Sequence, residues 1–201
     1  MGIFTKIWFS PRIVFRHVND YCQDEFVKPL LFLAGISRAF DRASIKDLGD
    51  TMSLFGICAM CIFVGGFLGW IAYYIYALAI NWTGKWLKGA GNTASILRVM
   101  AYAMIPSVAA LILLIPQMII CGNGLFQSDW DMSEAGLLAN LVFWPVWFLE
   151  VVLGIWTIVL LIIGVSEVQK FSIWKSILNI LMPGLLFFIF IFLFVFVKKI
   201  I

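Results

Sequence analysis

Charged residues are scarce in this chain. Asp, Glu, Lys and Arg make up 12% of its 201 residues, and there is one histidine, whereas a soluble domain has about 25% charged residues. The chain therefore has too little polar surface to coat a water-soluble globule. Apolar residues make up 63% of the sequence, and they occur in runs of the length that a hydrocarbon core of about 30 Å demands. The composition indicates an integral membrane protein.

The sequence also lacks the usual signatures of catalysis and of nucleic-acid binding. It has no nucleophile elbow, no Ser-His-Asp order, no phosphate loop and no metal-like spacing of His and Asp. Its net charge is only +3, without a cluster of Lys and Arg interleaved with aromatic residues. We expect a protein that is not an enzyme, binds no nucleic acid and uses no cofactor or metal.

Four cysteines raise the question of redox or metal chemistry. Cys58 and Cys61 have the spacing of a redox or metal pair, but they lie in an apolar run without a His or a second Cys pair to complete a site. Cysteine in apolar surroundings behaves as a small hydrophobic residue. We expect packing roles for both and no structural disulfide.

The first 25 residues mix large apolar side chains with charges, and Pro11 suits the first turn of a helix. This pattern predicts an amphipathic segment over residues 1–25 that lies at the membrane interface. A solvated tail that packs on a helical bundle would show the same pattern. Both interpretations are open at the level of sequence.

Four long apolar runs predict membrane-spanning helices at about 52–80, 94–120, 135–165 and 173–197. A weaker run, 26–40, is interrupted by Lys28, Pro29 and Arg38. It spans the bilayer only if its basic side chains reach opposite faces, and otherwise it is re-entrant or interfacial. The predicted fold class is an all-α membrane bundle over 26–201 with five hydrophobic helices, four of them firm and one short or re-entrant.

The distribution of basic residues favours one topology. With five crossings and an inner N-terminus, most Lys and Arg residues fall on the inner side, as is typical of membrane proteins. The outer ones are Arg38, Arg42, Lys46, Lys198 and Lys199. The loop from Cys121 to Glu134 has three acidic residues and no basic one, and it falls outside. We expect a cytoplasmic N-terminus.

Glycines mark a helix-packing face in the first long run. Gly65, Gly66 and Gly69 lie together, and the Gly65-x-x-x-Gly69 spacing lets another helix approach closely. Self-association through this face would make the protein an oligomer.

Glu150 is the candidate for a functional site within the membrane, because an ionisable group in a span is energetically unfavourable and usually faces the bundle interior or water. It could hold a proton or a cation, with Asn140, Gln117 and Arg98 as partners from other parts of the chain. The alternative is a protonated Glu150 that simply forms a hydrogen bond between helices.

A second group of charged residues follows the weak apolar run. Asp41, Arg42, Asp47 and Asp50 could form a cluster at one mouth of the bundle. The alternative is a solvated loop with surface ion pairs that contribute about 0 to 1 kcal/mol each.

Five motifs lie in and between the apolar runs. They are Ser10-Pro11-Arg12-x-x-Phe15-Arg16, Asp41-Arg42-Ala43-Ser44 to Gly49-Asp50, Asn81-Trp82-Thr83-Gly84-Lys85-Trp86-Leu87, Arg98-x-x-Ala101-Tyr102-Ala103-x-x-Pro106, and Leu153-Gly154-Ile155-Trp156 to Glu167-Val168-Gln169-x-Phe171-Ser172. In this order and spacing they resemble the Yip1 family of multi-pass membrane proteins, in particular its bacterial branch. The resemblance covers nearly the whole chain and implies five membrane helices with a cytosolic N-terminus.

The resemblance also implies a class of function. Eukaryotic members of the family act in Golgi and endoplasmic-reticulum trafficking, bind prenylated small GTPases and associate with similar membrane proteins. A bacterium offers no Rab-type partner, so small-GTPase binding is not carried over. We expect a protein of the bacterial inner membrane that associates with itself, with lipids or with other membrane proteins.

Two other classes of function compete with this one. A small channel or transporter for an ion or small solute would use Glu150 and the proline-broken spans. A membrane-bound enzyme would require chemistry at the cluster from Asp41 to Asp50. Transport that depends on Glu150, or turnover that depends on the cluster, would distinguish them.

Overall fold

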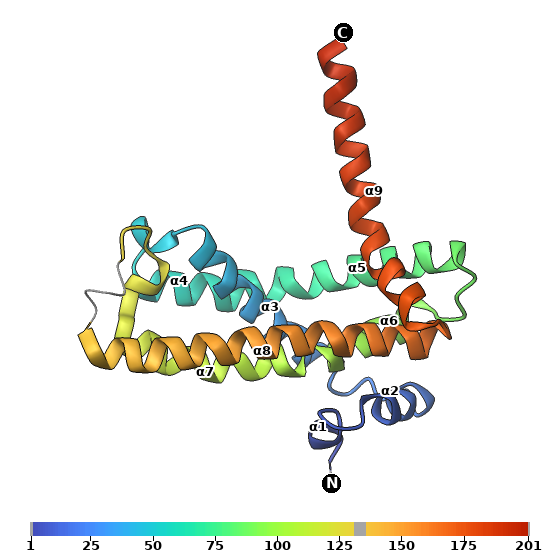
Figure 1. Ribbon diagram of the computed structural model, residues 1–201, viewed down its shortest axis with the longest axis horizontal. Coiled ribbons are helices and arrows are strands. Elements are labelled where there is room, and N and C mark those ends of the chain that lie inside the picture. Colours follow the sequence, from blue (N-terminus) through green and yellow to red (C-terminus); the bar gives the residue numbers. More distant parts are fainter. Residues whose placement is uncertain (1, 131–135, 201) are drawn as a thin grey trace. The chain divides into compact units, whose positions relative to one another are not determined.

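The computed structural model describes residues 2–130 and 136–200, and these are mostly helical, with no β-strand among them (Figure 1). The elements in chain order are α1 (Ile3–Lys6), α2 (Pro11–Asp20), α3 (Val27–Ile45), the short 3-10 helix η1 (Leu48–Asp50), α4 (Leu54–Met60), the π-helix η2 (Cys61–Gly65), α5 (Gly66–Trp86), α6 (Thr93–Ala103), α7 (Ile105–Cys121), the 3-10 helix η3 (Gly122–Phe126), α8 (Gly136–Gln169) and α9 (Ile173–Ile200).

Four helical stretches are long and apolar enough to cross a membrane. They are Leu54–Trp86, Thr93–Phe126, Gly136–Gln169 and Ile173–Phe196. They coincide with the four firm spans expected from the sequence, and the all-α membrane fold is confirmed. The first residue of the span predicted from 135 lies outside the described residues.

Helix α3 is the short segment whose crossing the sequence leaves open. It has 19 residues, which at 1.5 Å per residue corresponds to about 28 Å. It continues five residues beyond the predicted end at residue 40, so that Asp41 and Arg42 are helical rather than part of a loop. With Lys28 and Arg38 it contains four charged residues, and it is not among the four candidate spans. A fifth crossing stays a prediction.

The described residues fall into two compact units. The α3 unit consists of residues 24–73 and 101–160, and the α9 unit consists of residues 1–23, 74–100 and 161–201. Each unit therefore combines segments that are far apart in the sequence.

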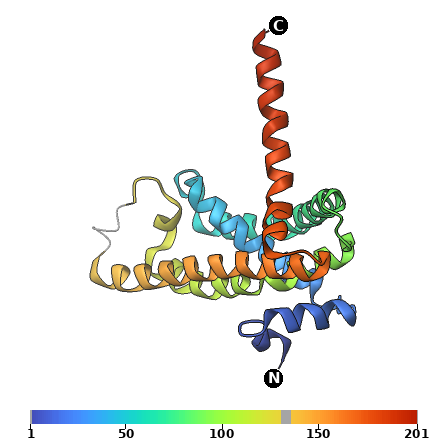
Figure 2. The same cartoon turned by 45° about the vertical axis from the view of Figure 1, so that its right-hand side comes forward.

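Within the α3 unit, α3 packs against η2 and α7, and α7 lies alongside α8 in both ribbon views (Figures 1 and 2). Three glycines allow the closest of these approaches. A Cβ atom added to Gly35 would overlap the carbonyl oxygen of Gly65 and lie 2.9 Å from the Cα atom of Gly69. Helix backbones approach this closely only where side chains are absent. The face predicted from Gly65, Gly66 and Gly69 is thus occupied by α3 of the same chain.

Two long spans are interrupted near their middle. In the first, the π-helix η2 makes a wider turn between α4 and α5. In the second, the helix breaks at Met104, one residue before the start of α7, where Pro106 occupies the first turn. Pro116 lies inside α7, and the helix continues through it. Of the two prolines in this span, Pro106 therefore coincides with a break between helices and Pro116 does not.

Within the α9 unit, α2 begins at Pro11 as expected and buries Val14, Phe15 and Val18. Ile13 of the same helix and Phe9, in the turn before it, are largely exposed. This segment packs on the unit with one face and presents large apolar groups on another, so features of both interpretations of the N-terminal segment are present.

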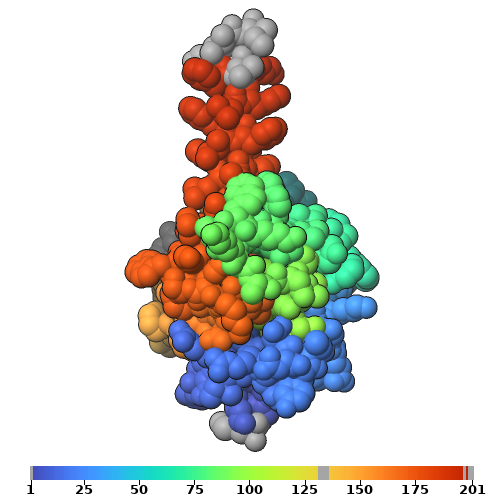
Figure 3. Space-filling view, turned by 90° about the vertical axis from the view of Figure 1, so that its right-hand side faces the viewer, coloured from blue at the N-terminus to red at the C-terminus, as the bar shows by residue number. Residues whose placement is uncertain are grey.

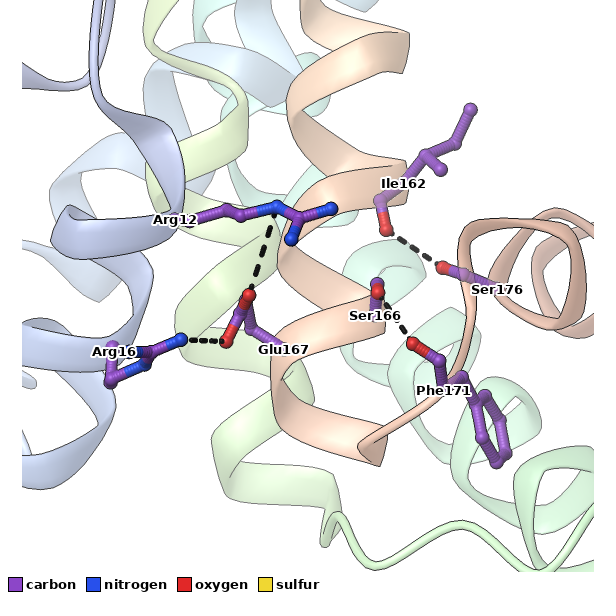
Figure 4. A network of polar contacts seen from close by, with 7 residues as sticks. All are labelled: Arg12, Arg16, Ile162, Ser166, Glu167, Phe171 and Ser176. Atoms are coloured by element: carbon purple, nitrogen blue, oxygen red, sulfur yellow. Dashed lines mark hydrogen bonds and ion pairs between the residues drawn. The ribbon is translucent and has the colours of Figure 1, made fainter.

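The turn between α8 and α9 is held by polar contacts (Figure 4). Lys170 ends α8 with a positive φ of 58°. The Ser166 hydroxyl donates to the carbonyl of Phe171 at 2.7 Å, and the Ser176 hydroxyl donates to the carbonyl of Ile162 at 2.7 Å. These two bonds fix the start of α9 beside the end of α8.

The C-terminal half of α9 is exposed along its length. Every residue from Phe187 to Phe196 is exposed, and the side chains of this half stand out around the helix in the space-filling view (Figure 3). Six of these ten residues are phenylalanines. A helix that is apolar on all sides is typical of a segment surrounded by lipid or by other membrane helices.

Candidate functional site

A cavity of about 680 Å³ lies within the α3 unit, between α3, α7, η3 and α8. Its polar lining includes Asp41 and Ser37 from α3, Gln117 from α7 and Glu150 from α8. Aromatic side chains complete the wall, among them Trp130 and Trp147. The cavity thus combines two carboxyl groups with an amide, hydroxyls and an apolar wall.

Gln117 of α7 and Glu150 of α8 line the same cavity. Gln117 is 3% exposed. Asp41 of α3 lines this cavity as well. Of the partners expected for Glu150, the structure brings Gln117 into place and adds Asp41, which the sequence assigned to another cluster.

The helical period of α3 explains how Asp41 reaches the cavity. Residues 37, 41 and 44 follow the i, i+4, i+7 spacing of one helix face, and all three line the cavity. Ser37 on this face hydrogen-bonds with Ser107 of α7, with 3.2 Å between the hydroxyl oxygens.

Such an arrangement can hold a proton or a cation. Two carboxyl groups in one cavity repel each other when both are ionised, so a proton or a bound positive charge stabilises them. An amide can donate to one carboxyl oxygen while the hydroxyl groups offer further donors and acceptors. Among the described residues, no three His, Cys, Asp or Glu side chains are grouped so as to hold a metal ion.

The other two residues expected near Glu150 have different partners. Asn140 lies on α8, where its side-chain amide donates to the carbonyl of Gly136 at 3.0 Å and its oxygen accepts from the Trp144 indole at 3.1 Å. Arg98 belongs to the α9 unit and donates to the side-chain oxygen of Asn19 at 3.4 Å. Neither residue lines the cavity.

The four charged residues expected at one mouth are divided between several surroundings. Asp41 lines the cavity, whereas Arg42 lies on another face of α3 and borders a separate groove. Asp47 has a left-handed backbone conformation with φ 50° at the end of the α3 turn. Asp50 accepts two hydrogen bonds from Ser128, at 3.1 Å from its backbone nitrogen and 2.7 Å from its hydroxyl.

The cysteines are all free thiols. Cys61 is fully buried in a hydrophobic cluster with Ile36, Phe40 and Ile57, and Cys58 packs against the same cluster. Both lie where α3 meets η2.

Sequence reasoning missed two parts of the cavity. Ser37 and Ser107 lie in apolar runs and carry no charge that would attract notice, although hydroxyls at matching positions of two spans are a usable signal of helix pairing. Trp130 and Trp147 resemble the aromatic residues that mark any membrane interface. Trp130 follows η3 and Trp147 lies on α8. The two come together in the cavity wall only in the tertiary fold.

Several long apolar helices and no described β-strand define the chain as a multi-pass α-helical membrane protein. The sequence model of the Yip1 domain matches residues 5–195, nearly the whole chain, and the chain belongs to the Yip1 family. No curated protein and no solved structure gives a significant match.

Proposed function

We propose that the protein acts without catalysis, by associating with copies of itself, with lipids or with other membrane proteins, and so contributes to the organisation of its membrane. The observation that supports this proposal is the exposed C-terminal half of α9, where six phenylalanines between Phe187 and Phe196 are each more than half exposed. Membership of the Yip1 family supports the same class of function.

Lipid chains are as apolar as these side chains, so helices associate in a bilayer through packing rather than through the hydrophobic effect. Aromatic side chains offer large rigid contact surfaces, and a pair of them contributes about 0.5–1.5 kcal/mol beyond burial. Phe192 and Phe196 already stack within one helix, with 6.3 Å between ring centroids. The free faces of these rings can pack on a second copy of α9.

The test is energy transfer between copies in liposomes at increasing protein density. Cys22 is exposed, and after replacement of the other three cysteines by serine it can carry the dye. Replacing the six phenylalanines by leucine should weaken self-association at least about tenfold, the effect of losing 1.4 kcal/mol. Exchanging Ile189 and Ile191 for leucine is the matched control. Energy transfer that survives the six replacements would refute α9 as the contact.

We further propose that the chain lies in a bacterial inner membrane with a cytoplasmic N-terminus and five crossings, α3 being the fifth. The uneven distribution of basic residues supports this orientation. Labelling with a membrane-impermeant thiol reagent tests this topology. The two sites are Cys22, which lies before α3, and a cysteine introduced at Lys198. Five crossings require the two sites to react from opposite sides of the membrane.

The cavity favours a second candidate function, the passage or binding of a proton or small cation. Asp41, Gln117 and Glu150 meet there, and ionisable groups inside a span often mark ion pathways. Proton and cation flux in proteoliposomes should then fall sharply in Glu150→Gln. Asn140→Ala is the control, since it changes a polar residue of the same helix outside the cavity wall. Equal flux in all three proteins would remove this candidate.

A further inference from the structure

A second hollow, of about 490 Å³, lies in the α3 unit on another face of α3, against η2 and α5. Three basic residues line it, namely Arg38 and Arg42 of α3 and Lys46 directly after the helix. They follow the i, i+4, i+8 spacing of one helix face, so successive residues rise about 6 Å along the axis. We call this hollow the basic groove.

The basic residues of the groove are available to a ligand. All three are exposed, and within the described chain neither Arg42 nor Lys46 makes an ion pair. Asp41, the acidic residue next to Arg42 in sequence, lines the cavity rather than the groove.

The floor of the groove is apolar. It is formed by Val64, Leu68 and Ala72, and all three are exposed. Gly65 and Gly69 also border the groove, where they contact Gly35 and Ala39 of α3. An extended hydrocarbon chain can lie along such a floor, whereas a small inorganic anion would leave it uncovered.

The charge and the surroundings select the ligand. Arginine and lysine form strong, charge-assisted hydrogen bonds with phosphate oxygens, and basic pockets between membrane helices bind the headgroups of anionic lipids. The groove opens beside the span Leu54–Trp86, whose neighbours in the bilayer are lipids. A phosphate joined to acyl chains matches both the basic side and the apolar floor.

We propose that the basic groove binds an anionic glycerophospholipid, with its phosphate between Arg38, Arg42 and Lys46 and one acyl chain on the floor formed by Val64, Leu68 and Ala72. This names the lipid class for the proposed function and rests on the part of it that involves lipid. Self-association through α9 is a separate part, and it can fail or succeed independently.

The test uses the full-length protein in phosphatidylcholine liposomes with spin-labelled phosphatidylglycerol or phosphatidylcholine as the probe. The measured quantity is the ratio of protein-associated signal for the two lipids. Each basic residue near an anionic headgroup is worth about a five-fold preference. The wild-type protein should therefore prefer phosphatidylglycerol, and Arg42→Gln combined with Lys46→Gln should reduce the preference by an order of magnitude or more. A wild-type protein without preference would overturn the proposal.

Two further variants separate the groove from general effects. Lys85→Gln combined with Lys175→Gln removes the same charge from exposed lysines of the α9 unit and should leave the preference unchanged. Ala72→Phe keeps every charge and fills the floor, so it should reduce the preference as well, and it decides the question if the double variant fails to fold. If the lysine control lost the preference for phosphatidylglycerol to the same extent, the effect would come from overall charge. That result would contradict binding in the groove.

Competition and association measurements complete the test. Inorganic phosphate, compared with chloride at equal ionic strength, should not displace the labelled phosphatidylglycerol, and displacement would show a plain anion site and overturn the lipid assignment. Energy transfer between copies should be unchanged in the groove variants, so failure of the groove and failure of α9 self-association are distinguishable.

Discussion

A pair of glycine substitutions tests whether the crossing of α3 and α5 stabilises the fold. A Cβ atom at Gly69 would overlap the Cα atom of Gly35 and lie 3.3 Å from its carbonyl carbon. The atoms it meets are backbone atoms, so relief requires the two helices to move apart. At Gly154 on α8, nothing lies within 4 Å of the added Cβ atom. Gly69→Ala and Gly154→Ala thus make the same chemical change in a crowded and in an open place.

The expected difference follows from two opposing effects. Alanine stabilises a helix interior relative to glycine by about 0.5–1 kcal/mol, and both variants gain this. Overpacking of a well-packed contact costs about 1–3 kcal/mol, and only Gly69→Ala suffers it. The free energy of unfolding of Gly69→Ala should therefore lie about 1–3 kcal/mol below that of Gly154→Ala, because the helix-propensity gain cancels between them.

Reversible unfolding in mixed detergent and SDS micelles, followed by circular dichroism, gives the two free energies. Gly35→Ala should resemble Gly69→Ala, since its Cβ atom would meet Gly65 and Gly69. Equal stability of Gly69→Ala and Gly154→Ala would refute the close crossing. In that case the glycine face would be available for contacts between copies of the protein.

Two more predictions use the same protein in micelles. Glu167→Gln removes the partner of Arg12 and Arg16, at 3.9 and 3.2 Å (Figure 4). Each surface ion pair is worth about 0–1 kcal/mol, so the loss of both should raise amide exchange in α2 by at most about 30-fold. Slower amide exchange in the variant would contradict this. The side-chain amide of Asn179 donates to the Ile80 carbonyl and the Thr83 hydroxyl, at 2.9 and 2.8 Å. Asn179→Leu removes both bonds and should lower the free energy of unfolding by about 1–2 kcal/mol. An unchanged unfolding midpoint would contradict this.

The long spans could be predicted from sequence because their signal is local. About 20 consecutive apolar residues have few alternatives to a membrane helix. The packing partner of the glycine face has no such signal, since Gly35 lies 30 residues before Gly65 in a segment that also contains charges. Crossing geometry depends on where two helices meet, and a single glycine in a weak apolar run does not indicate that place.

The candidate site was predictable in part for a related reason. Gln117 was expected beside Glu150 because buried polar groups in spans seek partners. Asp41 was assigned to a loop, since the apolar run ends at residue 40, whereas α3 continues to Ile45. Once the helix is extended, its period separates Asp41 from Arg42 onto different faces. A boundary error of five residues thus concealed both the second carboxyl group of the cavity and the basic groove.

The π-helix η2 sets the rotational register of everything that follows it in the same span. Each α-helical residue turns the chain by about 100°, and a π-helix accommodates one additional residue in a helix that is otherwise α-helical. Deleting one residue between Cys61 and Gly65 would let an unbroken α-helix form and would swing Gly69 and Tyr73 about a quarter turn away from α3. Homologous chains that lack this residue would need their small side chains at shifted positions. The length of this short stretch, more than its composition, determines which side of α5 meets α3.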